Sequence, residues 1–171
     1  MIFPERKGNF IRGLYDMIAY IGDTKDMSII EIGTWTGCAT EIFCQNFKHV
    51  ITIDPFVNGI GALNNKYDMN LVYEFFKKRI EKYHNITIIK DYSHNVKSIT
   101  ADVVYIDGSH TYIDVKRDSL NYQNRARFYI AGHDYHKRFP GVITAVNEVL
   151  GIPDKIFKDT SWIFKKENIN V

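Results

Sequence analysis

The chain has 171 residues and a mass of 19.9 kDa, which is about the size of one domain. Apolar residues make up 45% of the chain, charged residues 25% and aromatic residues 14%, and this composition excludes an intrinsically disordered protein. The formal net charge of +2 is too small to demand a nucleic-acid partner, and the absence of any apolar run of about 18 residues excludes a membrane-spanning helix.

The first part of the chain alternates between predicted helices and strands. Apolar residues at steps of three and four predict a helix over residues 8–21. Short β-branched runs predict strands over 28–32 and 49–53, and a glycine turn followed by a helix over 38–47 connects them. Residues 55–66 contain proline, glycine and asparagine, so we expect them to form a loop.

A longer amphipathic helix is predicted next, over residues 68–83. Its apolar and aromatic residues are more typical of a packed core than of a stacking surface. The side chains expected to face inward are Leu71, Phe75, Phe76 and Ile80.

The second half of the chain repeats the alternation and closes with two strands. In chain order, we expect a strand at 86–89, a strand at 102–106, a helix at 111–123, a strand at 128–131, a helix at 141–150, and strands at 155–158 and 161–165. This alternation predicts an α/β fold with a doubly wound, mostly parallel sheet of seven strands. The last two strands are joined by a short turn, so they should form an antiparallel hairpin at one sheet edge. We expect one domain over residues 1–171, in which residues 1–28 form an N-terminal helical segment.

The two cysteines, Cys38 and Cys44, lie six residues apart on a predicted helix. This spacing places them on different faces, so no disulfide is expected between them, and no further cysteine is present for a zinc site. Residues 1–7 lack the basic and then apolar order of a signal peptide. We therefore expect two buried thiols in a cytoplasmic protein.

Polar residues gather just past the predicted ends of five strands. In an open parallel sheet, ligands bind outside the carboxyl ends of the strands, so these segments should converge on one site. The segments are 31–37, 54, 91–93, 107–110 and 133–136.

The turn after the first predicted strand contains Gly33 and Gly37, which let the backbone approach a ligand closely. Their G-x-x-x-G spacing is not the G-x-G-x-x-G of dinucleotide-binding proteins, which argues against a nicotinamide-dependent oxidoreductase. Asp54 ends the next strand, where a carboxylate can accept hydrogen bonds from two ribose hydroxyls. The glycine turn alone fits an ordinary connection equally well, but together with Asp54 it favours a nucleoside-containing ligand.

Four motifs resemble those of class I S-adenosylmethionine-dependent methyltransferases, over roughly residues 28–150. The first looks like motif I of that family and the second like its ribose-binding strand end. The last two resemble one subgroup, the small methyltransferases near the catechol and macrocin O-methyltransferases and the cephalosporin hydroxylase-like proteins. The motifs are Glu31-Ile32-Gly33-Thr34-Trp35-Thr36-Gly37, Ile51-Thr52-Ile53-Asp54, Val104-Tyr105-Ile106-Asp107-Gly108-Ser109-His110-Thr111-Tyr112 and Gly132-His133-Asp134-Tyr135.

The resemblance implies a Rossmann-like methyltransferase domain with S-adenosylmethionine as its cofactor. Asp54 would bind the ribose, residues 91–93 would meet the adenine, and Asp107 would lie beneath the sulfonium. Trp35 fits a packing or substrate-wall residue as well. The residues that the resemblance assigns to the cofactor are Glu31, Gly33, Thr34, Trp35, Gly37, Asp54, Asp91, Tyr92, Ser93 and Asp107.

The catalytic candidates are His110 and Asp107. His110 has the ordinary pKa range of a general base that takes a proton from a hydroxyl, although it could instead hydrogen-bond a helix N-terminus. The resemblance also implies Mg²⁺ as a further candidate cofactor, held by Asp107, His133 and Asp134. The alternative is that Asp107 and His133 only bind the cofactor or cap loops.

The predicted function is therefore S-adenosylmethionine-dependent methylation, with O-methylation of a small-molecule or glycosyl acceptor as the leading expectation. The alternative is a catalytically inactive protein that binds S-adenosylmethionine or S-adenosylhomocysteine. A nucleic-acid acceptor is not expected, because neither an Asn/Asp-Pro-Pro-Tyr motif nor a Pro-Cys nucleophile is present. A homo-oligomer is a further expectation, since few residues outside the core remain for acceptor recognition.

Overall fold

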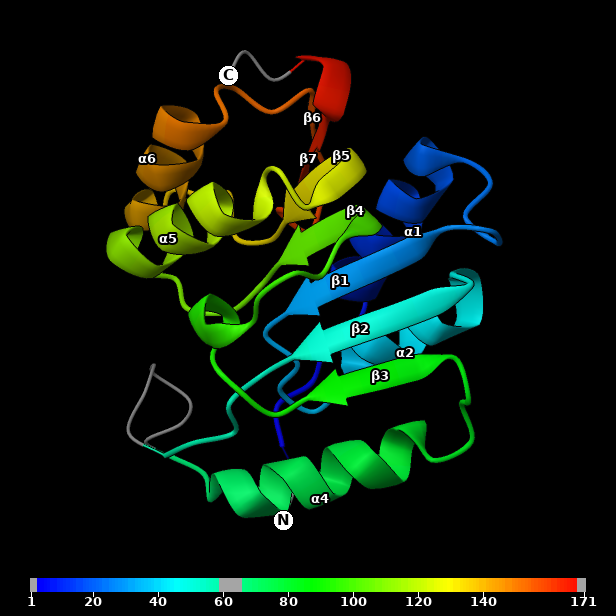
Figure 1. The fold of residues 1–171 in the computed structure, drawn as a ribbon. Coiled ribbons are helices and arrows are strands. Elements are labelled where there is room, and N and C mark those ends of the chain that lie inside the picture. Colours follow the sequence, from blue (N-terminus) through cyan, green and yellow to red (C-terminus); the bar gives the residue numbers. More distant parts are fainter. Residues whose placement is uncertain (1–2, 59–65, 169–171) are drawn as a thin grey trace.

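The protein is described here by a computed structural model that covers residues 3–58 and 66–168 (Figure 1). The helices are α1 (Asn9–Ile21), α2 (Cys38–Asn46), α4 (Met69–Ile80), α5 (Tyr112–Tyr122) and α6 (Pro140–Val149), with short 3-10 turns η1 (Ser93–Asn95) and η2 (Lys166–Asn168). The strands are β1 (Ser28–Ile32), β2 (His49–Ile53), β3 (Ile86–Ile89), β4 (Ala101–Ile106), β5 (Ala126–Gly132), β6 (Lys155–Ile156) and β7 (Trp162–Lys165).

The seven strands form one sheet in the order β3-β2-β1-β4-β5-β7-β6. β1 to β5 run parallel to one another, whereas β7 pairs antiparallel with both β5 and β6. This arrangement confirms the predicted α/β fold and the antiparallel hairpin at one edge. The arrowheads of β1 to β5 point to the same side of the molecule, so their carboxyl ends lie together there (Figure 1).

Helices cover both faces of the sheet, as the continuous apolar strands predict. Alternate residues of β4 enter different clusters: Val104 and Ile106 pack with α5 and α6, and Val103 and Tyr105 pack with α1 and α2. α4 has its own small cluster beside the β3 edge of the sheet (Figure 1). The sheet is therefore buried on both faces, and its strand ends are where polar side chains can meet a ligand.

Two predictions for α4 are wrong. Leu71 and Phe75, which were expected to face inward, are 47% and 39% exposed. The buried stripe starts at Met69 and continues through Val72, so Phe76 and Ile80 belong to it while Leu71 lies one position off. The helix ends at Ile80, three residues before the predicted end.

Smaller differences concern the cysteines and the element ends. Cys44 is buried as expected, but Cys38 is partly exposed, and both thiols are free. β5 begins at Ala126, two residues before the predicted start, and β6 contains only Lys155 and Ile156. Of the loop predicted over 55–66, residues 59–65 lie outside the described part of the chain. None of the helices in residues 3–58 and 66–168 is both long and apolar enough to cross a membrane.

Candidate cofactor and active site

The glycine turn joins β1 to α2 at the carboxyl edge of the sheet. Gly33 and Gly37 have φ angles of 89° and 78°, which favour glycine over residues with a side chain. A Cβ atom on Gly33 would lie 2.2 Å from the carbonyl oxygen of Asp107, and one on Gly37 would lie 2.5 Å from the ring of Phe76. Gly33 therefore lets the turn lie directly against the end of β4.

Gly33→Ala should destabilise the fold by more than about 3 kcal/mol, because the new methyl group meets backbone at a left-handed position. Gly22 is the matched control: its φ is 99° and a Cβ there meets nothing within 4 Å. Gly22→Ala should therefore cost only about 1–2 kcal/mol of backbone strain. Urea unfolding measures both, and equal losses in the two variants would contradict the close approach of Gly33 to Asp107.

Asp54 holds the glycine turn from the end of β2. Its Oδ2 accepts hydrogen bonds from the backbone N–H groups of Thr34 at 2.9 Å and Trp35 at 3.2 Å, and its Oδ1 accepts one from Phe56 at 2.8 Å. Burial raises the pKa of Asp54, although these three hydrogen bonds act in the opposite direction. A carboxylate has about four acceptor positions, so Asp54 retains capacity for a further donor.

Glu31, on β1, is fully buried. Its Oε2 accepts hydrogen bonds from the hydroxyl groups of Thr40 at 2.5 Å and Thr52 at 2.8 Å. Its Oε1 has no hydrogen-bond partner in the described part of the chain. Burial raises the pKa of Glu31 to about 8. A buried acceptor without a donor is costly, and a cationic or N–H group of a ligand would satisfy it.

The predicted adenine segment follows β3. The Oδ1 of Asp91 accepts hydrogen bonds from the backbone N–H of Tyr92 at 2.7 Å and from Asn95 at 2.8 Å, and these bonds lower its pKa. The hydroxyl of Ser93 donates to Oδ1 of Asp118 on α5 at 2.5 Å. The loop is thus fixed both internally and by α5.

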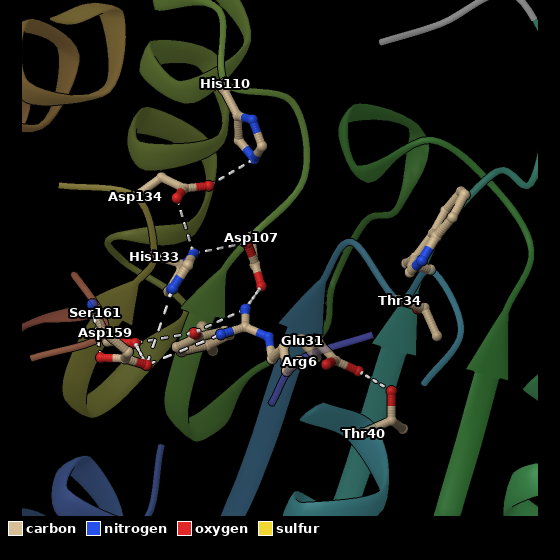
Figure 2. Close-up of polar contacts among 12 residues, drawn as sticks. Arg6, Glu31, Thr34, Thr40, Asp107, His110, His133, Asp134, Asp159 and Ser161 are labelled. Atoms are coloured by element: carbon tan, nitrogen blue, oxygen red, sulfur yellow. Dashed lines mark hydrogen bonds and ion pairs between the residues drawn. The ribbon is translucent and has the colours of Figure 1, made fainter. Parts of the chain in front are cut away.

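Four side chains form a chain of polar contacts past β4 and β5 (Figure 2). His110 Nε2 lies 2.8 Å from Oδ2 of Asp134, and His133 Nδ1 lies 3.1 Å from Oδ1 of Asp134 and 3.7 Å from Oδ1 of Asp107. Burial alone would raise the pKa of Asp134, but the two histidine hydrogen bonds outweigh it and hold the pKa well below its usual range. The same hydrogen bond to Asp134 raises the pKa of His110.

The side chains that could hold a metal differ in one member from the set implied by the sequence. Ligand atoms of Asp107, His110 and Asp134 all lie within 4.8 Å of one another. His133 is not in this group, although its Nδ1 lies 3.1 Å from Oδ1 of Asp134 and 3.7 Å from Oδ1 of Asp107. The group thus contains two of the three ligands that the resemblance implies, together with His110.

The sequence of residues 30–135 matches the family described as a methyltransferase domain. The chain belongs to this methyltransferase family. The matched region contains the glycine turn, Asp54, the segment after β3 and the two residues of the His110–Asp134 contact. No curated protein matches the chain.

Solved structures resemble the methyltransferase over most of its length. Precorrin 8w decarboxylase from Methanobacterium thermoautotrophicum aligns with a TM-score of 0.63 at 12% identity, covering 95% of this chain and 87% of its own. The N-methyltransferase NodS from Bradyrhizobium japonicum, in complex with S-adenosyl-L-homocysteine, aligns with a TM-score of 0.57 at 14% identity, covering 92% and 98%. At identities this low, the alignments show that the fold is shared and do not by themselves show a shared activity.

A third similar structure is much longer than the present chain. Phosphoethanolamine N-methyltransferase 1 from Haemonchus contortus, in complex with phosphoethanolamine and S-adenosylhomocysteine, aligns with a TM-score of 0.59 at 12% identity. The alignment covers 89% of the methyltransferase described here but only 29% of that protein. The resemblance to class I S-adenosylmethionine-dependent methyltransferases is thus confirmed for family and fold, while the narrower subgroup stays a prediction.

Three residues that contact the methyltransferase site were missed in the sequence. Arg6 pairs with Asp107, Asp118 holds Ser93, and Asp159 lies 3.9 Å from both Arg6 and His133. Asp159 is almost fully buried and accepts two hydrogen bonds from Ser161. None of the three belongs to a strand-end motif, so local sequence carries no signal that would place them here.

Asp118 gives the methyltransferase a distinct dependence of stability on pH. Burial raises the pKa of Asp118 from 3.8 to about 6. At pH values between these two, the carboxyl group is protonated in the folded state but ionised in the unfolded state. The free energy of unfolding should therefore fall by up to about 3 kcal/mol, through this group, as the pH rises from 4 to 6. Asp118→Asn removes this loss and keeps an acceptor for Ser93.

Urea unfolding at a series of pH values measures the effect. The gain in stability of Asp118→Asn over the wild type should be larger at pH 7 than at pH 4. Asp16→Asn, at an exposed position of α1, is the matched control and should show no such trend. A constant difference between Asp118→Asn and the wild type across this range would contradict the raised pKa.

Proposed function

We propose that the chain is an S-adenosylmethionine-dependent O-methyltransferase that acts on a small-molecule or glycosyl acceptor. The observation that carries this proposal is the contact between His110 Nε2 and Asp134, 2.8 Å long, beside Asp107 at the carboxyl edge of the sheet. A histidine oriented by a carboxylate is the arrangement that takes a proton from a hydroxyl group.

The residues present fit the cofactor. A ribose hydroxyl would donate a hydrogen bond to the remaining acceptor position of Asp54. The amino group of the cofactor would donate one to Oε1 of Glu31, which has no partner in the described part of the chain. Asp107 would face the sulfonium, and Asp91, Tyr92 and Ser93 would form the adenine side. When bound, S-adenosylmethionine supplies a methyl group on a positively charged sulfur. The protein's own contribution is to align acceptor and methyl group and to remove a proton.

His110 acts on the acceptor through its second ring nitrogen. An ionised carboxylate can only accept hydrogen bonds, so the contact with Asp134 requires the proton of a neutral ring to lie on Nε2. Nδ1 is then the atom that accepts the hydroxyl proton. Asp134 fixes the ring and stabilises the imidazolium that forms.

The test is methyl transfer from labelled S-adenosylmethionine to a panel of small hydroxyl and glycosyl compounds, with matched amines. Transfer to at least one hydroxyl compound, and less to its amine analogue, is the expected result. Cofactor binding without transfer to any member would favour the alternative of a binding protein without catalysis. Preferred transfer to amines would overturn the O-methylation proposal.

Magnesium dependence stays a prediction, with Asp107, His133 and Asp134 as the ligand set that the resemblance implies. The same assay after treatment with a chelator, with and without added Mg²⁺, tests it. Cytoplasmic location, a single domain over residues 1–171, a homo-oligomer and the narrower subgroup also remain predictions. Gel filtration coupled to light scattering tests the oligomeric state.

A further inference from the structure

Residues 3–7, called here the N-terminal strap, lie against the glycine turn. The carbonyl oxygen of Pro4 accepts a hydrogen bond from Trp35 Nε1 at 3.0 Å. Phe3 is buried, and its ring packs edge-on against Trp35 at 6.3 Å and Phe75 at 5.4 Å between centroids. Glu5 forms an ion pair with Arg79 of α4. The strap is thus anchored on both sides of the turn that is predicted to hold the cofactor.

The strap inserts Arg6 among the acidic residues of the site. The Arg6 side chain is only 16% exposed, and its Nη2 forms an ion pair with Oδ2 of Asp107. The same nitrogen lies 3.5 Å from the hydroxyl of Tyr105, and Nη1 lies 3.9 Å from Oδ2 of Asp159. Figure 2 shows the guanidinium between Asp107 and Asp159.

Arg6 is not fully satisfied in this position. Its Nη1 is buried and has no hydrogen-bond partner among the described residues, as is also true of Oε1 of Glu31. A buried cation with an unpaired donor is a costly arrangement compared with full pairing. The contact is therefore one that a better-fitting cation could replace.

The cofactor carries such a cation at the end that this site would bind. Asp107, the residue assigned to the sulfonium, forms an ion pair with Arg6, and the charge of Arg6 also acts on Glu31, the residue assigned to the amino group. Arg6 and the positively charged end of the cofactor therefore compete for the carboxylate of Asp107.

We propose that the N-terminal strap is a built-in competitor of the cofactor, in which Arg6 pairs with the carboxylate of Asp107 and must leave it before S-adenosylmethionine binds. The proposal rests on the proposed function, because it takes the cofactor site as given. The strap thus neutralises the charge of Asp107 until the cofactor displaces Arg6. In the opposite role, Arg6 would stay in place and pair with the carboxylate of the cofactor. Removing Arg6 would then weaken cofactor binding.

Calorimetric titration without an acceptor tests the competition, with S-adenosylhomocysteine as the comparison that lacks a charged sulfur and S-adenosylmethionine as the ligand, because the cofactor carries the sulfonium assigned to Asp107. Arg6→Gln should bind S-adenosylmethionine about 5- to 30-fold more tightly than the wild type, since no ion pair has to be broken. Phe3→Ala loosens the strap without touching the carboxylates and should tighten binding by a smaller factor. Arg12→Gln, at an exposed position of α1, is the matched control and should leave the affinity unchanged.

Limited trypsin digestion of the wild type provides a second measurement that needs no variant. Cleavage after Arg6 and Lys7 should become faster when S-adenosylmethionine is added, because the strap is released from the site. This readout stays informative where Arg6→Gln fails to fold.

The outcomes separate the two proposals. No binding by the wild type would overturn the proposed function and the competition with it. Binding by the wild type, together with equal or weaker binding by Arg6→Gln, would overturn the competition alone. Unchanged or slower cleavage of the strap on addition of S-adenosylmethionine would also overturn it.

Discussion

Asp54→Ala should lower the affinity for S-adenosylhomocysteine by about 30- to 1,000-fold. A hydrogen bond from a ribose hydroxyl to the carboxylate is lost, and a hydrogen bond to a charged group contributes roughly 1.5–3 kcal/mol. The glycine turn also loses the acceptor that holds the backbone of Thr34 and Trp35. Both effects act in the same direction, because the turn and the carboxylate belong to one binding site.

Two further variants separate these contributions. Asp54→Asn keeps one acceptor oxygen but loses the charge, so its affinity should fall between those of the wild type and Asp54→Ala. Asp26→Ala removes a carboxylate that is 97% exposed and should bind like the wild type. Calorimetry measures all three, and wild-type affinity in Asp54→Ala would remove Asp54 from the cofactor site.

His110→Ala should lower kcat for methyl transfer by about 100- to 10,000-fold, the usual contribution of a general base. The affinity for S-adenosylhomocysteine should stay within a few-fold of the wild-type value, because His110 contacts Asp134 rather than the assigned cofactor residues. The relevant measurement is kcat with a hydroxyl acceptor from the panel, with cofactor affinity determined in parallel.

The matched control for His110 is His136, which lies on the loop after β5. His136→Ala should keep nearly full activity. Asp134→Asn should give an intermediate loss, because the His110 ring keeps a neighbour but loses a charged partner. Equal activity in His110→Ala and the wild type would show that proton removal takes place elsewhere.

The order of elements and the sheet type could be predicted because their causes are local. The apolar run of β1 and the glycine that ends it are visible within a few residues, and so is the alternation that makes a parallel sheet. The carboxyl-edge rule then brought Glu31, Asp54, Asp107 and Asp134 toward one site without any knowledge of contacts. The prediction failed where a helix face had to be chosen, as for Leu71 on α4.

The contacts that complete the site depend on long-range packing and were not visible in the sequence. Arg6 reaches Asp107 across 101 positions of the chain, and Asp118 reaches Ser93 across 25. The resemblance implied His133 as a metal ligand, and its Nδ1 lies 3.1 Å from Oδ1 of Asp134. Its Nε2 lies 3.9 Å from Asp159, on the turn before β7, a residue with no motif of its own.

The central claim is that the carboxyl edge of the sheet binds S-adenosylmethionine and its product. The most direct measurement is calorimetric titration of the wild-type chain with S-adenosylhomocysteine, with NAD as the control nucleotide. We expect one molecule to bind per chain, with a dissociation constant in the range of about 1 μM to 1 mM that is typical of enzyme substrates, and no binding of NAD. No heat of binding with S-adenosylhomocysteine at millimolar concentration, or tighter binding of NAD, would contradict the account.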